Sequence, residues 1–353
     1  MAESPEKLKF AIVLSGGGAR GAYEAGVFSY IRSELPREIG ESPLFSLYCG
    51  TSVGAINSAF LASRANDPIF QGAELRRLWQ GLRDENIYYA DYKALTGFLV
   101  RSGFFMATNF FGMNKLLERG GGKRSTPFPF KSVLDTTPFV YFLRRNVAWA
   151  QIHRNIQRRH LDAVTVSATH MQSGEPALFI EKHPEVEFRR GGITPVFGPL
   201  APKHVLASAA IPLVFPIIRI NRQFFGDGSL RQNTPMSPAI HLGANRILVV
   251  GTHNSNSPPR GGPAPWRLME AEPTIGDILG TLLDALFVDK LEYDLEQMRR
   301  INFLIGDFEE HHGSEALRAV NAVRQNVELG GTEIHEVRKI IPFVISPSKN
   351  IGA

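Results

Sequence analysis

The chain has 353 residues, of which 43% are hydrophobic and 21% charged, with a formal net charge of +5 and one cysteine. A single cysteine excludes a disulfide scaffold, and this apolar fraction is typical of a globular chain rather than a disordered one. The charge is too small to argue by itself for nucleic acid, and we expect no nucleic-acid partner. At this length, one large α/β domain and two smaller domains are both reasonable expectations.

Nothing in the sequence predicts a targeting or membrane-spanning segment. Residues 1–9, MAESPEKLK, contain two glutamates and no apolar core, unlike a signal peptide. The longest apolar stretch, Leu206 to Ile218, has about 13 residues, whereas a bilayer needs about 20. The lone Cys49 suits a reducing compartment. We therefore expect a cytoplasmic protein, with a peripheral position on the inner face of the membrane as an option.

The first 65 residues alternate between apolar runs and helical patterns. Residues 8–14 (LKFAIVL) form a continuous apolar run that ends at a serine and three glycines, which is typical of a buried parallel strand. A helix is predicted over 21–35, a second strand over 44–49 and a second helix over 55–65. This order predicts the start of a parallel α/β sheet.

Further elements are predicted along the rest of the chain. Strand-like runs occupy residues 162–169, 177–181, 216–220, 246–251, 301–305 and 339–345, and helices are predicted over 132–144, 149–158 and 201–209. In the strand-like stretch IIRINRQFF, Asn221 and Arg222 could form a hairpin turn. Apolar spacing predicts a long amphipathic helix over 274–298, with Thr274 and Asp277 as a capping pair. Residues 252–273 read as a long loop.

Residues 82–130 differ from the rest of the chain because eight aromatic residues fall between Asn86 and Met113, whereas the whole chain is 10% aromatic. We interpret this segment as an inserted cap. It could be an irregular helical pair that covers the core, or a wall or lid for an apolar ligand. Its rings and the basic residues near them could also contact an anionic membrane surface.

The strongest chemical motif is Gly50-Thr51-Ser52-Val53-Gly54. It fits G-x-S-x-G, follows an apolar strand and opens a predicted helix. In this context, small residues on both sides of the serine allow a sharp turn that lifts the hydroxyl above the sheet. The helix N-terminus at this turn favours an oxyanion. Ser52 is therefore the candidate nucleophile.

A second motif, Ser15 to Gly21 (SGGGARG), follows the first strand. Its consecutive backbone amides could point at one anion. Gly16, Gly18 and Gly21 also match G-x-G-x-x-G, but a dinucleotide site requires an acidic residue after the next strand, and that strand ends near Ser52 instead. We favour an oxyanion hole for Ser52 over a nucleotide site or a purely structural turn. Arg20 could steady the turn or bind an acidic head group.

The third motif is Gly226-Asp227-Gly228-Ser229, in which Asp-Gly is also an ordinary turn dipeptide. Asp227 is nevertheless the candidate base, because an acyl-transfer serine needs a base and no histidine is well placed in the sequence. A Ser52, Asp227, His241 or His253 order does exist and leaves a triad as an alternative. No Cys/His or H-E-x-x-H spacing predicts a metal site, and we expect no cofactor.

Taken in order, GGGARG, GTSVG and DGS resemble the motifs of the patatin-like phospholipases, and Leu206 to Gly251 and Val133 to Arg145 resemble bacterial members. The resemblance implies a three-layer α/β/α fold with a mostly parallel central sheet in a single domain over 1–353. Within it we place the core at about 8–305, the inserted cap at about 82–130 and a C-terminal extension at about 306–353.

The resemblance also implies site residues. Ser52 would be the nucleophile and Asp227 the base of a dyad, and the backbone of Gly16, Gly17 and Gly18 would form the oxyanion hole. The supporting residues would be Arg20, Gly21, Gly50, Gly54 and Gly228. One departure is that the acidic motif ends in Ser229, whereas the family usually has Gly or Ala there.

The function predicted from these residues is hydrolysis of a phospholipid, lysophospholipid or other acyl ester. Two alternatives stay open, a regulatory or scaffold protein with little turnover and a nucleotide-binding module. The sequence gives neither the head-group preference nor the oligomeric state.

Overall fold

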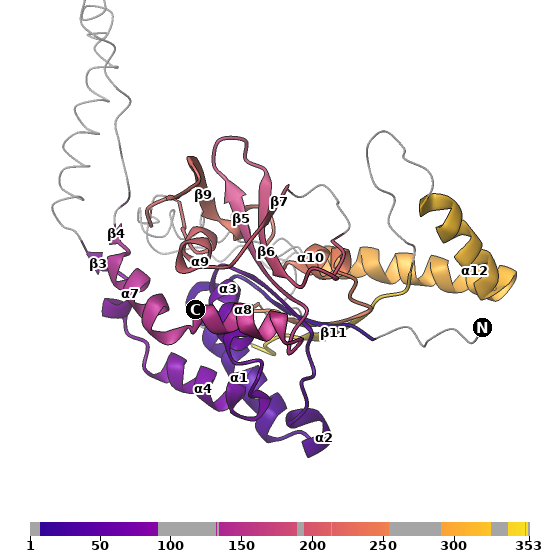
Figure 1. Ribbon diagram of the computed structural model, residues 1–353, viewed down its shortest axis with the longest axis horizontal. Helices are drawn as coiled ribbons and strands as arrows, with labels where there is room; N and C mark the ends of the chain where they lie inside the picture. Colours follow the sequence, from indigo (N-terminus) through magenta and orange to yellow (C-terminus); the bar gives the residue numbers. More distant parts are fainter. Residues whose placement is uncertain are drawn as a thin grey trace, which may run out of the picture.

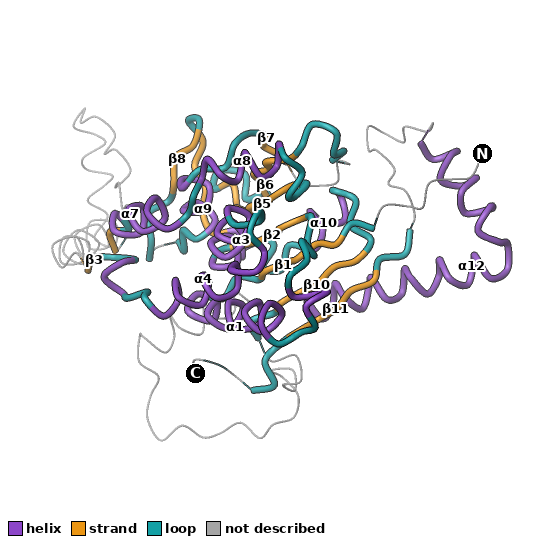
Figure 2. The backbone as a smooth tube through the Cα atoms, turned by 60° about the horizontal axis from the view of Figure 1, so that its bottom comes forward, coloured by secondary structure: helices purple, strands orange, loops and turns teal. Residues whose placement is uncertain are grey.

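The computed structural model describes residues 8–90, 132, 134–188, 194–212, 214–253, 291–325, 338–349 and 351. Within these residues a mostly parallel β-sheet lies between two layers of helices (Figure 1, Figure 2). The strands are β1 Phe10–Leu14, β2 Leu47–Thr51, β3 Tyr89–Ala90, β4 Leu134–Asp135, β5 Ala163–His170, β6 Pro176–Lys182, β7 Thr194–Phe197, β8 Ile218–Ile220, β9 Gln223–Asp227, β10 Arg246–Val250 and β11 Ile341–Ile345. The helices are α1 Gly21–Ser33, α2 Arg37–Gly40, α3 Val53–Ser63, α4 Pro68–Gln80, α7 Thr137–Asn146, α8 Trp149–Gln157, α9 Pro202–Ser208, α10 Met236–His241 and α12 Leu291–Gln325.

The strand order of the described sheet is β11-β10-β1-β2-β5-β6-β7. Its first five strands are parallel to their neighbours, whereas β6 is antiparallel to β5. The hairpin β8–β9 joins this sheet through β5. Because β11 pairs with β10 along its whole length, the central sheet extends beyond residue 305, where we had placed the end of the core.

Alternating side chains on the central strands form two separate cores, one on each face of the sheet. On β1, Ile12 and Leu14 belong to the core under α1, α3, α8 and α9. Ala11 and Val13 point the other way, to the core under α10 and the first turns of α12. Strands buried on both faces explain the continuous apolar runs in the sequence. The result is a three-layer α/β/α fold.

Several predicted elements are confirmed in the structure. The predicted strands and helices of the first 65 residues correspond to β1, α1, β2 and α3, although each boundary differs by a few residues. The predicted hairpin is formed by β8 and β9, and Asn221 and Arg222 make its turn with φ of 49° and 67°. The helix predicted from 132 begins later, at Thr137, because Leu134 and Asp135 pair with β3.

The strand predicted over 301–305 is wrong, because these residues lie inside helix α12. The prediction assumed that an apolar run is buried. Instead, Ile301, Phe303 and Leu304 are more than half exposed, and Ile305 is 4% exposed. Only one side of the run faces the protein, which is a helical pattern rather than that of a central strand.

Two predicted segments lie largely outside the described residues. These are the cap, of which the structure describes residues 82–90, and the helix over 274–298, of which it describes 291–298. The capping pair Thr274 and Asp277 and the loop after residue 253 also lie outside. Among the residues that the structure does describe, no helix is both long and apolar enough to cross a membrane.

Candidate active site

Strand β5 brings the two predicted reactive side chains together. β2 runs parallel to β5 and ends with Thr51 opposite Ser167. β9 runs antiparallel to β5 and ends with Asp227 opposite Ala168, the next residue. The two strands therefore approach each other end to end along β5, because β6 occupies its other edge. Ser52, the residue after β2, consequently meets the last residue of β9.

Ser52 sits on a strained turn between β2 and α3. Its φ of 53° and ψ of −119° are unusual for a residue with a side chain, and such strain is often found at functional positions. The glycines on either side permit the turn. A Cβ on Gly50 would lie 2.2 Å from the carbonyl oxygen of Gly54, and one on Gly54 would lie 2.2 Å from that of Leu14. The G-x-S-x-G pattern therefore reflects close backbone packing here.

The Ser52 hydroxyl donates a hydrogen bond to Asp227 Oδ2 at 2.9 Å. Asp227 is fully buried, and Ser52 is 6% exposed. Burial raises the pKa of the Asp227 carboxyl to about 6, although hydrogen bonds from the Ser229 amide and the Ser52 hydroxyl act in the opposite direction. A raised pKa makes the carboxylate a stronger base than an exposed aspartate, and it accepts a hydrogen bond from the hydroxyl whose proton a nucleophilic serine must lose.

The backbone around Asp227 is held from three sides. Its amide donates to Ala210 O at 2.9 Å, and its carbonyl accepts a bond of 2.8 Å from Thr169 Oγ1. Asp227 Oδ1 accepts the Ser229 amide at 2.8 Å. A Cβ on Gly228 would lie 2.4 Å from the carbonyl oxygen of Ser167, so the turn packs closely on β5. Ser229 keeps this amide contact despite its departure from Gly or Ala.

The glycine turn packs directly beside Ser52. A Cβ on Gly16 would lie 3.4 Å from Ser52 Cβ, and only 2.4 Å from Asn233 Oδ1. The Gly16 amide donates to Asn233 O at 3.0 Å, so in this structure that amide serves the loop itself. The Gly16 carbonyl accepts a 2.7 Å bond from Thr252 Oγ1.

The amides of Gly17 and Gly18 differ from that of Gly16, since within the described part of the chain neither donates to a backbone carbonyl. Gly18 has a φ of 57° and open space at its Cβ position. Gly21 begins α1, where a Cβ would lie 2.2 Å from a Val53 methyl group, so α1 and α3 approach closely. Of the three predicted donors, Gly16 is therefore the one whose amide bonds to a backbone carbonyl outside helices and strands in the described part of the chain.

Arg20, which follows the glycine turn, makes two side-chain contacts. Its Nε donates to Ile351 O at 3.0 Å, and its Nη1 lies 2.8 Å from His253 Nε2. The guanidinium therefore ties the turn to the C-terminal residues and to the segment after β10. Both predicted roles of Arg20, steadying the turn and binding an acidic head group, stay predictions.

Three residues that the sequence analysis missed hold the site in place. Ser208, at the end of α9, accepts the Ser52 amide at 2.8 Å and donates to Ser167 O at 2.5 Å. Asn233 and Thr252 hold the two backbone polar groups of Gly16, as described above. Ordinary serine, asparagine and threonine residues carry no spacing signal, so only the fold could identify them.

The histidines of the alternative triad occupy other surroundings. Because Ser52 donates directly to Asp227 Oδ2, no imidazole lies between them. His241 packs on the Phe188 ring, with ring centroids 5.8 Å apart, and His253 contacts Arg20. Among the described residues, no group of three or more His, Cys, Asp or Glu could hold a metal ion.

The protein is thus a three-layer α/β/α protein with a serine–carboxylate pair where β2 and β9 end. The serine lies on a strained turn between a central strand and a helix, and the carboxylate is buried. The family model described as patatin-like phospholipase matches residues 12–240. That range contains the glycine turn, Ser52 and Asp227. The chain belongs to this family.

The chain also resembles curated proteins over part of its length. The chain is 27% identical over 263 residues to a cGAMP-activated phospholipase from Pseudomonas aeruginosa, covering 71% of this chain and 64% of the relative. It is 34% identical over 84 residues to patatin-like protein 2 of rice, Oryza sativa, covering 22% of this chain and 21% of the relative. The chain thus spans less than two thirds of the length of these relatives.

A solved structure, VipD from Legionella pneumophila, also resembles the chain. The identity is 13%, with 99% of this chain and 63% of that chain covered, at a TM-score of 0.36.

Proposed function

We propose that the protein is a serine hydrolase of lipid acyl esters, of the phospholipase A or lysophospholipase type. The observation that carries this proposal is the 2.9 Å hydrogen bond from Ser52 Oγ to the buried carboxylate of Asp227. Family membership supports the lipid class of the substrate. The strained φ of Ser52 supports the nucleophilic role, because such turns expose a hydroxyl at the N-terminus of a helix.

In the proposed mechanism, Asp227 accepts the Ser52 proton while Ser52 Oγ attacks the ester carbonyl carbon. The oxyanion that forms is stabilised by the amides of Gly17 and Gly18 and by the N-terminus of α3. The tetrahedral intermediate expels the alcohol, which takes the proton from Asp227. Water then attacks the acyl-enzyme with Asp227 again as the base, which releases the carboxylic acid and regenerates Ser52.

Burial of Asp227 makes this dyad reasonable without a histidine. An aspartate with the ordinary pKa of 3.8 is a poor base for a serine. A pKa of about 6 lies closer to neutral pH, and the carboxyl is still mostly ionised at that pH. General bases work best when their pKa lies near the working pH.

The test is labelling with a fluorophosphonate together with hydrolysis of a short soluble ester. Ser52→Ala should lose both, and Asp227→Asn should lose hydrolysis. Ser58→Ala is the matched control, because Ser58 is another buried serine on α3 and should keep both. Hydrolysis that survives Ser52→Ala would show that Ser52 is not the nucleophile. An absence of both labelling and hydrolysis in the folded wild-type protein would instead favour the scaffold or nucleotide-binding alternatives.

Two additional variants test the triad. His241→Ala and His253→Ala should retain hydrolysis if Asp227 alone is the base. If either loses hydrolysis while Asp227→Asn keeps it, the dyad is wrong. A panel of phospholipids and lysophospholipids assayed with wild-type protein would then define the subtype.

A further inference from the structure

A cavity lies between α8, the C-terminal half of β6 with the residues that follow it, and the end of β7. Its volume is about 710 Å³, within the range of ordinary small-molecule sites. Ile156 and Ile180 are almost fully buried and form its floor, and Phe197 is 55% exposed at its rim.

This cavity is separate from the proposed active site. None of its lining residues belongs to the serine–carboxylate pair or the glycine turn. On β5, Ser167 lies opposite Thr51, next to Ser52, whereas Thr165 lies opposite Ile180 and Ala163 lies opposite Lys182. Thr165 and Ala163 are two and four residues from Ser167. At about 3.3 Å per residue, the cavity therefore lies roughly 7–13 Å further along β5 than the Ser52 turn.

The lining combines apolar surface with one lysine, Lys182, that has no ion-pair partner among the described residues. The side chains of Ile156, Ile180 and Phe188, together with Phe197 and two prolines, provide the apolar surface. Both carboxylate oxygens of Glu181 already have partners, because Oε2 accepts the Leu200 amide at 2.7 Å and Oε1 lies 3.0 Å from His153 Nδ1.

Lys182 provides the charge at the edge of this cavity. Its ammonium donates to Val186 O at 2.6 Å and lies 5.8 Å from the centroid of the Phe197 ring. A lysine has three N–H donors, so two can still serve a ligand.

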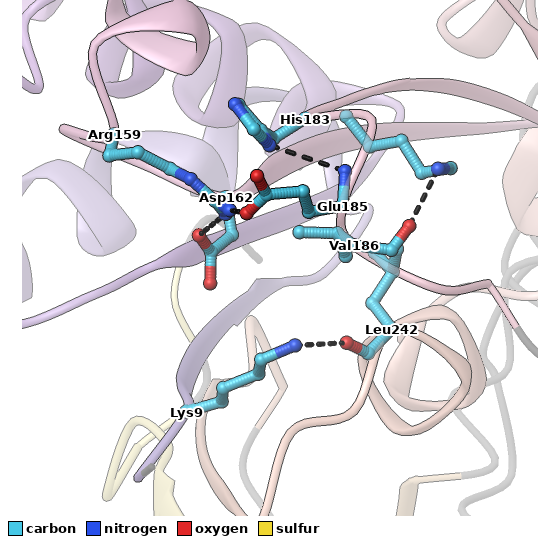
Figure 3. Close-up of polar contacts among 8 residues, drawn as sticks. Lys9, Arg159, Asp162, His183, Glu185, Val186 and Leu242 are labelled. Atoms are coloured by element: carbon cyan, nitrogen blue, oxygen red, sulfur yellow. Dashed lines mark hydrogen bonds and ion pairs between the residues drawn. The ribbon is translucent and has the colours of Figure 1, made fainter.

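The rim of the cavity is held in place by the protein itself. Figure 3 shows the turn from His183 to Val186, in which the Glu185 amide donates to His183 Nδ1 at 3.3 Å. Arg159 links this turn to the body of the protein, since it contacts Glu185 and also Asp162, the latter at 3.1 Å. A rim that is already ordered needs little rearrangement to bind a ligand, which favours affinity.

We propose that this cavity binds a long-chain carboxylate, with the alkyl chain along Ile156, Ile180 and Phe188 and the carboxylate on Lys182. One lysine matches one negative charge, and burial of the alkyl chain supplies most of the affinity. A ligand with two phosphates would need more cationic groups than the described lining residues offer. The proposal does not depend on Ser52. If the proposed hydrolysis is correct, the ligand is also a product of the reaction.

Calorimetric titration of full-length Ser52→Ala protein with octanoate, decanoate and dodecanoate, below their micelle concentrations, tests the proposal. Each added methylene should tighten binding about fourfold, because burying one CH₂ contributes about 0.8 kcal/mol. Lys182→Met in the same background should weaken dodecanoate binding about tenfold or more, because a charge-assisted hydrogen bond is lost. Lys339→Met is the matched control, since this lysine pairs with Glu309 on α12.

Several results would overturn the proposal. These are no binding at any chain length, equal binding of dodecanol and dodecanoate, and an unchanged affinity in Lys182→Met. Binding that disappears when wild-type protein is labelled at Ser52 by a fluorophosphonate, but survives Lys182→Met, would place the ligand in the active site instead. A cyclic dinucleotide that displaces dodecanoate through Lys182 would assign the cavity to another ligand class. Failure of labelling in wild-type protein concerns the proposed function alone.

Discussion

Replacing Asp227 with asparagine should abolish ester hydrolysis and at the same time stabilise the fold at neutral pH. The Asp227 carboxyl is fully buried, and burial raises its pKa to about 6 from an ordinary value of 3.8. An asparagine of the same shape removes the buried charge. Its Oδ1 can still accept the Ser229 amide, and its Nδ2 can donate to Ser52 Oγ. The main change is therefore the loss of a charge that the folded state desolvates.

The size of the effect follows from the shift in pKa. A rise of about two pKa units, at 1.36 kcal/mol each, corresponds to about 3 kcal/mol. Below about pH 4 the carboxyl is protonated in both the folded and the unfolded state, so ionisation contributes nothing. Between about pH 4 and 6 only the unfolded state loses its proton, and the wild type loses stability as pH rises. Above about pH 6 the difference between variant and wild type should be constant.

Urea unfolding of Asp227→Asn and wild type, at about pH 8 and about pH 4, measures this difference. The variant should be more stable by about 3 kcal/mol at the higher pH, and the gap should shrink at the lower pH. Asp67→Asn removes an exposed carboxylate and controls for net charge, with little expected change. If the wild type is the more stable protein at pH 8, the surroundings stabilise the Asp227 charge and the desolvation argument is refuted.

Three further predictions concern activity. The kcat/KM of wild type should fall tenfold per pH unit below about pH 6, because protonated Asp227 cannot accept the Ser52 proton; a profile that is flat down to pH 5 would contradict this. Ser208→Ala leaves the Ser52 amide without its acceptor, so unfolding in urea should become easier by about 1–3 kcal/mol, with a lower kcat; unchanged values for both would show that the contact is dispensable. Gly18→Ala should cost about 1–2 kcal/mol of strain, because φ is 57°, and should lower kcat about 10²-fold with little change in KM; a change confined to KM would indicate substrate positioning instead.

The local structure around each motif could be predicted from the sequence. The apolar run over 8–14 predicted a buried strand, and the strand-turn-helix pattern around Ser52 predicted a sharp turn, because these signals depend on neighbours close in the chain. The same local reasoning failed over 301–305, where an apolar run became a half-exposed helix. Whether an apolar run is covered depends on distant elements, which periodicity does not report.

From the sequence, Ser52 was predicted as the nucleophile from the G-x-S-x-G motif, and Asp227 as the base from an Asp-Gly turn. A triad with a histidine stayed open as an alternative. Only the tertiary structure decided that Ser52 and Asp227 meet, because they are 175 residues apart and β5 aligns the strands that end at them. It likewise decided that the Gly16 amide serves the loop and that Ser208 holds the Ser52 amide. These outcomes depend on strand register and on burial, which also sets the pKa of Asp227. Both properties arise when distant segments pack together.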